Sequence, residues 1–337
     1  MISKTATSWQ HRASWQTALA QAIRDPAQLL QQLQLPMDLL PAAQAAARRF
    51  PLRVPHSYLQ RIRPGDLDDP LLRQVLPLAE ECTSEPSGQI DPVGDLAAMP
   101  SPGLLHKYQG RALLVTTGAC AIHCRYCFRR HFPYASGNPL HQHRQATLEY
   151  LQTHPELNEL ILSGGDPLSL PDGQLAGWVR ECERFPHLQT LRLHTRLPVV
   201  LPERVDSALC TWLADTRLQT VIVLHINHPR EIDQQVSQAI DALRQSGATL
   251  LNQSVLLRGI NDSAATLTEL SHVLFANGVL PYYLHQFDPV QGALHFAVPL
   301  VEGQQLMTQL RASLPGYLVP RYVQEIPGMA AKYPISP

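Results

Sequence analysis

Short apolar runs rich in β-branched residues alternate with helix-compatible segments from about residue 111 onward, and this alternation restricts the fold more than any other feature. After a first, longer gap the runs recur roughly every 30 residues, a spacing typical of parallel βα units. Leu175–Arg184 and Asp233–Gln245 are two of the intervening segments that suit a helix. The six runs are Ala112–Thr116, Glu159–Leu162, Thr190–Leu193, Thr220–Leu224, Thr249–Leu256 and Pro281–Leu284.

The number of these units indicates the fold class. Six βα units are too few for a closed eight-stranded barrel. We therefore predict an α/β fold built on a partial (β/α)6 barrel, with an open doubly wound sheet as the alternative that the pattern leaves open. A helical and loop-rich segment over residues 1–100 precedes the barrel at 101–325, and a short closing segment at 326–337 follows it.

The N-terminal segment contains a clear signal for the start of a helix. Asp25 suits the N-cap and Pro26 suits the first helical position. Leu29, Leu30 and Leu33 then fall on one face, so we expect this face to pack on the core.

Charge and composition argue against several classes of partner and location. Lys plus Arg total 27 and Asp plus Glu total 28, a formal net charge of −1 that gives no support for nucleic acid or an anionic membrane as a partner. The polar start Met1–Lys4 lacks the apolar stretch of a signal peptide, and no apolar run is long enough to span a membrane. Six cysteines, three of them clustered, do not suggest a secreted disulfide scaffold, so we expect a cytoplasmic protein.

Polar and ionisable residues collect where the apolar runs end. In parallel barrels the carboxyl ends of the strands form the rim of the active site. Strands also end at polar residues because loops are solvated, so the pattern is strongest when taken over several strands. Five run ends carry such residues: Thr117-Gly118, Ser163-Gly164-Gly165-Asp166, His194-Thr195-Arg196, His225-Ile226-Asn227-His228 and His285-Gln286-Phe287-Asp288.

Three cysteines, Cys120, Cys124 and Cys127, follow the first run with the spacing C-x3-C-x2-C. Three thiolates on a [4Fe–4S] cluster leave one iron open to a further ligand. Structural zinc takes four ligands, so a zinc site would need His123 or a distant cysteine to complete it. Buried structural cysteines are another alternative, for which the close spacing offers no packing reason.

At this motif the sequence resembles the radical S-adenosylmethionine superfamily, whose cluster motif has this spacing after the first barrel strand. The resemblance implies a radical-SAM type of partial barrel, in which the open iron binds S-adenosylmethionine and one-electron reduction yields a 5′-deoxyadenosyl radical. The stretch Leu162–Pro167 fits the superfamily's glycine-rich turn after the second strand, where glycine allows close backbone approach. The expected cofactor contacts here and on a later strand are Ser163, Gly164, Gly165, Asp166 and His225.

Further stretches resemble the lysine 2,3-aminomutase family in order and spacing, from about residue 50 to the C-terminus. This family uses pyridoxal phosphate together with the cluster and S-adenosylmethionine. The matching stretches are Gly103–Tyr108, Arg111, Cys127–Arg130, Arg196–Val200, His225–Pro229 and Asn252–Leu257.

The resemblance also assigns the pyridoxal phosphate site. Lys332 matches the family's imine-forming lysine, although outside this context it would be taken for an ordinary surface lysine. Lys107 and Arg111 fall where the family binds the phosphate. Lys107 stands where arginine is common, which keeps the charge but loses bidentate geometry.

Three residues match the family's substrate contacts. Arg129 matches the residue that holds the substrate carboxylate, a task that suits a planar guanidinium. Asp288 and Glu325 match the acidic pair that receives the substrate ε-ammonium, with Glu325 in place of the more usual aspartate. Outside this context, Arg129 could belong to a solvated pair and either acid to a salt bridge.

The resemblance implies an isomerase that converts L-α-lysine to (R)-β-lysine by 2,3-amino migration with an external one-electron reductant. The helical N-terminal segment and a chain end soon after Lys332 are similar to the bacterial branch that supplies β-lysine for elongation factor P and its lysyl ligase. A homo-oligomer is one expectation for the assembly. A radical aminomutase for another amino acid, or a zinc-stabilised binding protein without catalysis, are the competing interpretations.

Overall fold

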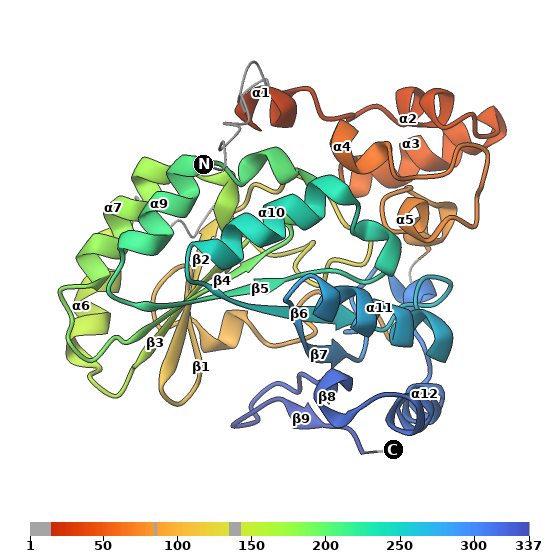
Figure 1. The fold of residues 1–337 in the computed structure, drawn as a ribbon. Coiled ribbons are helices and arrows are strands. Elements are labelled where there is room, and N and C mark those ends of the chain that lie inside the picture. Colours follow the sequence, from red (N-terminus) through yellow and green to blue (C-terminus); the bar gives the residue numbers. More distant parts are fainter. Residues whose placement is uncertain (1–14, 84–85, 135–142, 337) are drawn as a thin grey trace, which may run out of the picture.

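The computed structural model describes residues 15–83, 86–134 and 143–336, which form one curved sheet covered by helices (Figure 1). The strands pair in chain order from β1 to β9. Strands β2 to β8 are parallel, whereas β1 and β9 pair antiparallel at the two edges. The strands are β1 (Leu104–Tyr108), β2 (Arg111–Thr117), β3 (Glu159–Gly164), β4 (Thr190–Thr195), β5 (Gln219–Leu224), β6 (Thr249–Val255), β7 (Leu280–His285), β8 (Arg321–Gln324) and β9 (Tyr333–Pro334).

Helices occupy the crossovers between the parallel strands. A doubly wound sheet reverses its strand order at a switch point, whereas this order runs in one direction. The predicted partial barrel is therefore confirmed and the doubly wound alternative is wrong. The crossover helices are α6 (Arg144–Thr153), α7 (Asp172–Cys182), α8 (Leu197–Val200), α9 (Ser207–Asp215), α10 (Gln234–Gln245), α11 (Ala264–Ala276) and α12 (Leu300–Ser313).

Three strands extend the sheet beyond the six that the sequence predicts. Strand β8 continues the parallel order beside β7. It has four residues and β9 has two, so neither is long enough for a periodic signal. The chain turns at Gly328, whose φ is +79°, and returns so that Tyr333 pairs with Gln324 of β8. Residues after 325 thus add an edge strand to the sheet. The division of the chain into residues 1–100, 101–325 and 326–337 stays a prediction.

Short helices lead into the sheet, and most of them lie together on one side of the barrel in Figure 1. Helix α2 begins as predicted, because the Asp25 carboxylate accepts a 3.0 Å hydrogen bond from the backbone N–H of Ala27. Leu29 and Leu30 are fully buried and join one apolar cluster with strand residues such as Leu114. The helices are α1 (Trp15–Ala20), α2 (Pro26–Gln32), α3 (Leu40–Arg49), α4 (His56–Leu59) and α5 (Pro70–Arg73).

Within residues 15–83, 86–134 and 143–336, no helix combines the length and the apolar character that a membrane span needs. The stretch Met1–Lys4, on which the signal-peptide expectation rests, lies outside the described residues.

The buried carboxylate of Asp69 joins the N-terminal helices to the barrel. It caps α5 by accepting from the backbone N–H groups of Leu71 at 2.8 Å and Leu72 at 3.1 Å. Its second oxygen accepts from the backbone N–H of Arg63 and, at 2.7 Å, from the guanidinium of Arg230 beyond β5. One side chain therefore caps a helix of the N-terminal segment and also forms an ion pair between that segment and the barrel.

Replacing Asp69 with Ala should lower the free energy of unfolding by about 3 kcal/mol, because α5 loses its cap and Arg230 loses its buried partner. Urea denaturation measures this change. Asp68→Ala is the matched control: its side chain is 88% exposed and lies 3.6 Å from Arg73. We expect that variant to stay within about 0.5 kcal/mol of the parent protein. Equal destabilisation by the two substitutions would contradict this role.

Candidate active site

A cavity of about 530 Å³ extends from the carboxyl ends of the parallel strands, where the fold leads us to expect an active site, into the interior of the barrel. Every residue to which the family resemblance assigns a cluster, cofactor or substrate role lines it, so chain segments far apart in sequence meet in one place. These residues are Lys107, Arg111, Cys120, Cys124, Cys127, Arg129, Ser163, Gly164, Gly165, Asp166, His225, Asp288, Glu325 and Lys332.

The loop between β2 and α6 carries the cysteine triplet, and the N-terminal segment holds this loop in place. The backbone N–H of His123 donates to the carbonyl of Arg53 at 3.0 Å. The fully buried guanidinium of Arg125 forms a bidentate pair with Glu81, with N–O distances of 2.8 and 2.6 Å. Sequence reasoning did not single out Glu81, since an acid in a single 3-10 turn carries no local signal of burial. The position of the triplet thus depends on residues before the barrel.

The three thiols differ in their surroundings. Burial and neighbouring thiols raise the pKa of Cys120, and they raise the pKa of Cys127 to about 11. Metal binding would therefore displace protons from them. Cys124 instead accepts a hydrogen bond at 2.7 Å from Nη1 of Arg196. Among the described residues, no three His, Cys, Asp or Glu side chains converge closely enough to hold a single metal ion.

The glycines after β3 are required by a close approach of two chain segments. The backbone N–H of Gly165 donates to the Thr117 carbonyl at 2.7 Å, so the turn lies directly on the loop after β2. A Cβ atom at Gly165 would be 2.4 Å from the carbonyl oxygen of Ala119. Gly164 has a φ of +119°, and a Cβ there would meet the Thr117 oxygen at 2.7 Å. This packing gives the glycines a role in the protein itself, and their contact with a cofactor stays a prediction.

Asp166 ties the end of β3 to the end of β4. Its carboxylate accepts from the hydroxyl of Thr195 at 2.7 Å and from the backbone N–H groups of Arg196, at 2.7 Å, and Leu197, at 3.0 Å. Burial raises the pKa of Asp166 to about 6, although these hydrogen bonds favour its charged form. The carboxylate is thus largely used within the protein, and a cofactor contact from it stays a prediction.

A row of alternating charges crosses the cavity and centres on Asp95, a residue that sequence reasoning missed. Asp95 is 1% exposed and its two oxygens lie 2.6 Å from Lys107 Nζ and 2.6 Å from Arg129 Nε. Arg129 also donates to the hydroxyl of Ser163 at 3.2 Å. Burial alone would lower the pKa of Arg129, but Asp95 reverses this effect and raises it. Only the tertiary structure places Asp95 here, because its own segment shows no periodicity.

Two acids are candidates for binding an ammonium group, and their pKa values are shifted in opposite directions. Glu325 lies 2.9 Å from Lys107 and pairs with the ammonium of Lys332. These two cations overcome the effect of burial and lower the pKa of Glu325 well below its ordinary value. Burial and the nearby charge of Glu325 raise the pKa of Asp288 to about 7. The cavity therefore holds one firmly ionised carboxylate beside one that titrates near neutral pH.

Three of the histidines that line the cavity, His194, His225 and His285, are in their neutral form. Burial lowers the pKa of His225 to about 3 and that of His194 and His285 well below the ordinary value. Nε2 of His225 lies 2.8 Å from Nε2 of Gln253. In the described part of the chain, Nε2 of His194 and Nε2 of His285 are buried without a hydrogen-bond partner. Such orphaned atoms at a cavity wall fit a site that completes its hydrogen bonds with a bound group.

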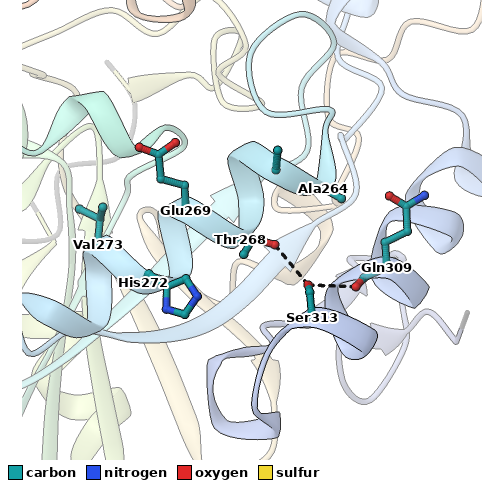
Figure 2. A pocket seen from close by; sticks show the side chains of 8 residues that line it. Ala264, Thr268, Glu269, His272, Val273, Gln309 and Ser313 are labelled. Carbon is teal, nitrogen blue, oxygen red and sulfur yellow. Dashed lines mark hydrogen bonds between the residues drawn. The ribbon is translucent and has the colours of Figure 1, made fainter.

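A second hollow lies between α11 and α12 on the outer side of the barrel (Figure 2). Thr268 of α11 and Ser313 of α12 face each other across it, with their hydroxyls 3.4 Å apart. Glu269 and His272 also contribute to its lining, which is otherwise mostly apolar. This hollow does not include any of the predicted site residues.

The architecture and the site together define a class of protein. Thiols, acids, amines and guanidinium groups gather in one cavity of a partial parallel barrel. This arrangement is typical of an α/β barrel enzyme.

Comparison of the sequence with characterised proteins identifies the family. The chain is 48% identical over 326 residues to L-lysine 2,3-aminomutase of Escherichia coli K12, which covers 96% of this chain and 95% of that protein. Identity to L-lysine 2,3-aminomutase of Haemophilus influenzae is 47% over 315 residues, covering 94% and 93%. For the Clostridium subterminale L-lysine 2,3-aminomutase it is 36% over 281 residues, covering 83% and 67%. The chain belongs to the L-lysine 2,3-aminomutase family, as the sequence predicted.

No family model matches the chain. Among solved structures, a radical SAM methyltransferase from Sphaerobacter thermophilus gives a TM-score of 0.45 at 18% identity, covering 65% of this chain and 68% of that one.

Gly165→Ala should destabilise the protein by about 2 kcal/mol or more, because the added Cβ meets backbone that cannot move aside. Gly173→Ala is the matched control: a Cβ there meets nothing within 4 Å, and the residue lies in α7. Alanine at this helical position should stabilise the protein by up to about 1 kcal/mol. Thermal unfolding compares the two variants, and an unchanged midpoint for Gly165→Ala would contradict the close approach of the two segments.

Proposed function

We propose that this protein converts L-α-lysine to (R)-β-lysine by 2,3-amino migration, with a [4Fe–4S] cluster, S-adenosylmethionine and pyridoxal phosphate as cofactors. The names of its close relatives support lysine aminomutase activity. The observation that carries the proposal is an alkylammonium group already bound at the acidic end of the cavity. This group is the side chain of Lys332, which pairs with Glu325.

The acidic end of the cavity supports lysine as the substrate. The ammonium of Lys332 is chemically the same group as the end of a substrate lysine. If the Lys332 amine is engaged by a cofactor, Glu325 becomes available to another ammonium, with Asp288 beside it. Two carboxylates attract a cationic side chain and repel an anionic one. The site thus favours lysine over acidic amino acids.

The opposite end of the substrate would be held by Arg129. Its guanidinium is buried, and its orientation is fixed by Asp95 at Nε and by Ser163 at Nη1. A guanidinium fixed in this way suits recognition of a carboxylate. Holding the substrate at both ends keeps C2 and C3 in place, and positioning of this kind lowers the barrier more than acid–base assistance would here.

The residues present fit pyridoxal phosphate. Lys332 offers a primary amine for covalent attachment of the aldehyde, and Lys107 and Arg111 supply positive charge for the phosphate. The guanidinium of Arg111 lies over the ring of Tyr108, with 4.6 Å between its central carbon and the ring centroid. The unpartnered Nε2 atoms of His194 and His285 leave hydrogen-bonding capacity in the same cavity.

The residues present also fit an iron–sulfur cluster. Cys120, Cys124 and Cys127 line the cavity together, and three thiolates match a cluster with one open iron. When bound, the cluster would supply the electron that cleaves S-adenosylmethionine, and pyridoxal phosphate would carry the migrating amino group. The protein itself binds the substrate at both ends and surrounds it with cavity walls that exclude water.

The wider setting is part of the same proposal. Similarity over nearly the full length of the Escherichia coli protein supports placement in the bacterial branch that supplies β-lysine for elongation factor P and its lysyl ligase. A one-electron reductant would reduce the cluster in the cytoplasm, where thiols are kept reduced. A homo-oligomeric assembly belongs to the proposal as well.

Anaerobic reconstitution with iron, sulfide and pyridoxal phosphate, followed by a lysine assay with S-adenosylmethionine and dithionite, tests the function. We expect β-lysine, separated from α-lysine by chromatography. Cys127→Ala should lose most of its iron and all turnover, because the cluster loses a ligand. Cys210→Ala, which changes a half-buried thiol on α9, should keep both. A fully loaded protein without lysine turnover, or equal iron in the two variants, would refute the proposal.

The titration of Asp288 predicts how lysine binding depends on pH. The ammonium of the substrate binds the ionised carboxylate, and the pKa of Asp288 is about 7, so binding weakens as pH falls. Between pH 8 and pH 6 the ionised fraction falls about tenfold, and the KM for lysine should rise by a similar factor. The groups that face this carboxylate are Glu325, Lys332, Lys107 and Asp95.

Asp288→Asn isolates this effect from Asp166, whose pKa is about 6. The variant should have a high KM for lysine. Because residue 288 can no longer be protonated, its titration should no longer raise this KM over the same pH range. The cavity histidines do not interfere, because burial keeps them neutral over that range. A KM profile identical in the variant and the parent protein would remove Asp288 from the ammonium site.

A further inference from the structure

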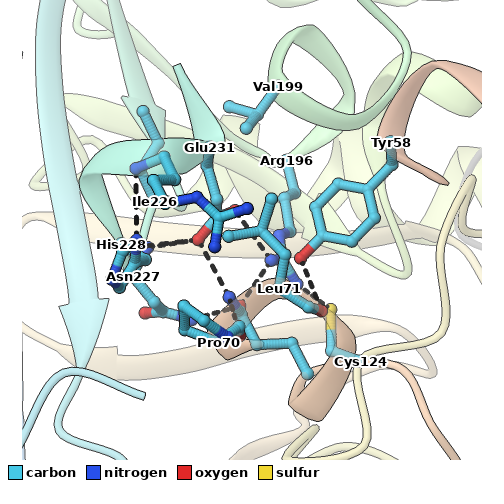
Figure 3. A network of polar contacts seen from close by, with 12 residues as sticks. Tyr58, Pro70, Leu71, Cys124, Arg196, Val199, Ile226, Asn227, His228 and Glu231 are labelled. Carbon is cyan, nitrogen blue, oxygen red and sulfur yellow. Dashed lines mark hydrogen bonds and ion pairs between the residues drawn. The ribbon is translucent and has the colours of Figure 1, made fainter. Parts of the chain in front are cut away.

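A buried polar network lies beneath the cysteine loop and reaches one of the three thiols (Figure 3). Its centre is Arg196, which follows β4 and is 5% exposed. Nη1 of Arg196 donates to the sulfur of Cys124 at 2.7 Å. Nη2 donates to Gln74 at 2.6 Å and to Glu231 at 2.8 Å. One guanidinium thus connects the N-terminal segment, the loop after β5 and the cysteine triplet.

The position of the guanidinium is fixed from several directions. The rings of Tyr58 and Tyr126 each lie with their centroids 5.6 Å from its central carbon. Glu231, which is 0% exposed, also accepts from the backbone N–H groups of Asn227 at 2.9 Å and His228 at 3.1 Å. Burial would raise the pKa of Glu231, but Arg196 and the N–H group of Asn227 lower it, so the carboxylate is charged. The network therefore holds a fixed ion pair with its positive end against sulfur.

A positive charge in contact with a cluster ligand changes the energy of electron transfer. When a cluster gains one electron, its negative charge increases, and a nearby cation stabilises the reduced form. Hydrogen bonds to cluster sulfurs and local charge are among the factors that set reduction potentials. Because the Arg196 contact is buried, solvent and salt screen it little.

We propose that Arg196, held by Glu231 and Gln74, is a positioning residue that orients the Cys124 ligand and raises the reduction potential of the cluster. This inference rests on the proposed function, since it requires a cluster on the cysteine triplet. The redox step adds one electron from an external one-electron reductant and neither forms nor breaks a bond. Glu231 opposes the effect of Arg196, because its negative charge lies on the far side of the guanidinium.

The two members of the ion pair should therefore act in opposite directions. Arg196→Gln removes the positive charge and should shift the potential to more negative values. The expected shift is at least tenfold in the ratio of reduced to oxidised cluster, which is 59 mV for one electron. Glu231→Gln removes the counter-charge but keeps a carbonyl oxygen for Arg196, and it should shift the potential to more positive values. Arg196→Lys keeps the charge and should fall between Arg196→Gln and the parent protein.

The experiment is a potentiometric titration of the anaerobically reconstituted protein, followed by the paramagnetic resonance signal of the reduced cluster. It is done without S-adenosylmethionine, so that contacts with that molecule do not contribute. Iron and sulfide are measured in each sample. Arg192→Gln is the matched control, because Arg192 lines the same cavity but its guanidinium pairs with Glu159. It should change the potential less than Arg196→Gln does.

Opposite shifts for Arg196→Gln and Glu231→Gln at full iron content would establish the inference. Unchanged potentials, or shifts of the same sign in both variants, would overturn it, because a merely structural network has no reason to produce opposite signs. If Arg196→Gln does not hold a cluster, the Glu231→Gln titration decides: a positive shift supports the inference, and any other result overturns it. Failure of the parent protein to assemble a cluster refutes the proposed function instead, so the two failures are distinguishable.

Discussion

Parallel strands that pair in chain order bring every carboxyl end to the same rim, and in this chain those ends deliver much of the chemistry. The loop after β2 supplies thiols, the turn after β3 supplies glycines and Asp166, and the loop after β7 supplies Asp288. None of these groups is near the others in sequence. Their convergence follows from strand order, because a reversal of that order at any point would send some strand ends to another region of the sheet.

Charge compensation is the second condition that this cavity meets. A buried charge is costly unless it is paired, and several buried ions here have a partner of opposite sign. Asp95 lies between Lys107 and Arg129, Glu325 between Lys107 and Lys332, and Glu231 against Arg196. These pairs hold long, flexible side chains in one orientation. They also separate the acids by pKa: Glu325 stays ionised, while Asp288 titrates near neutral pH. The ion pairs that stabilise the cavity therefore also determine which carboxylate is ionised and able to bind the ammonium group of a ligand.

Much of the fold and of the site could be predicted, and the failures have physical causes. The six long parallel strands and the capped helix at Asp25 show clear periodicity, so they could be found from pattern alone. Strands β8 and β9 are too short for such a pattern. Asp95, Glu81 and Glu231 could not be found because acids in irregular segments look alike until burial separates them. The glycines after β3 were predicted as close-contact residues, and the structure shows that one contact is the neighbouring loop.

By itself, the sequence determined the βα alternation, the cysteine spacing, the polar strand ends and membership of the family. These properties depend on residue type and on separation along the chain, which folding does not change. Only the tertiary structure decided that Arg196 contacts Cys124, that Asp95 joins two cations, and that Lys332 occupies the acidic end of the cavity. These contacts join residues that are between 7 and 72 positions apart along the chain. Their distances are set by the packing of the whole barrel, and no local pattern in the sequence records them.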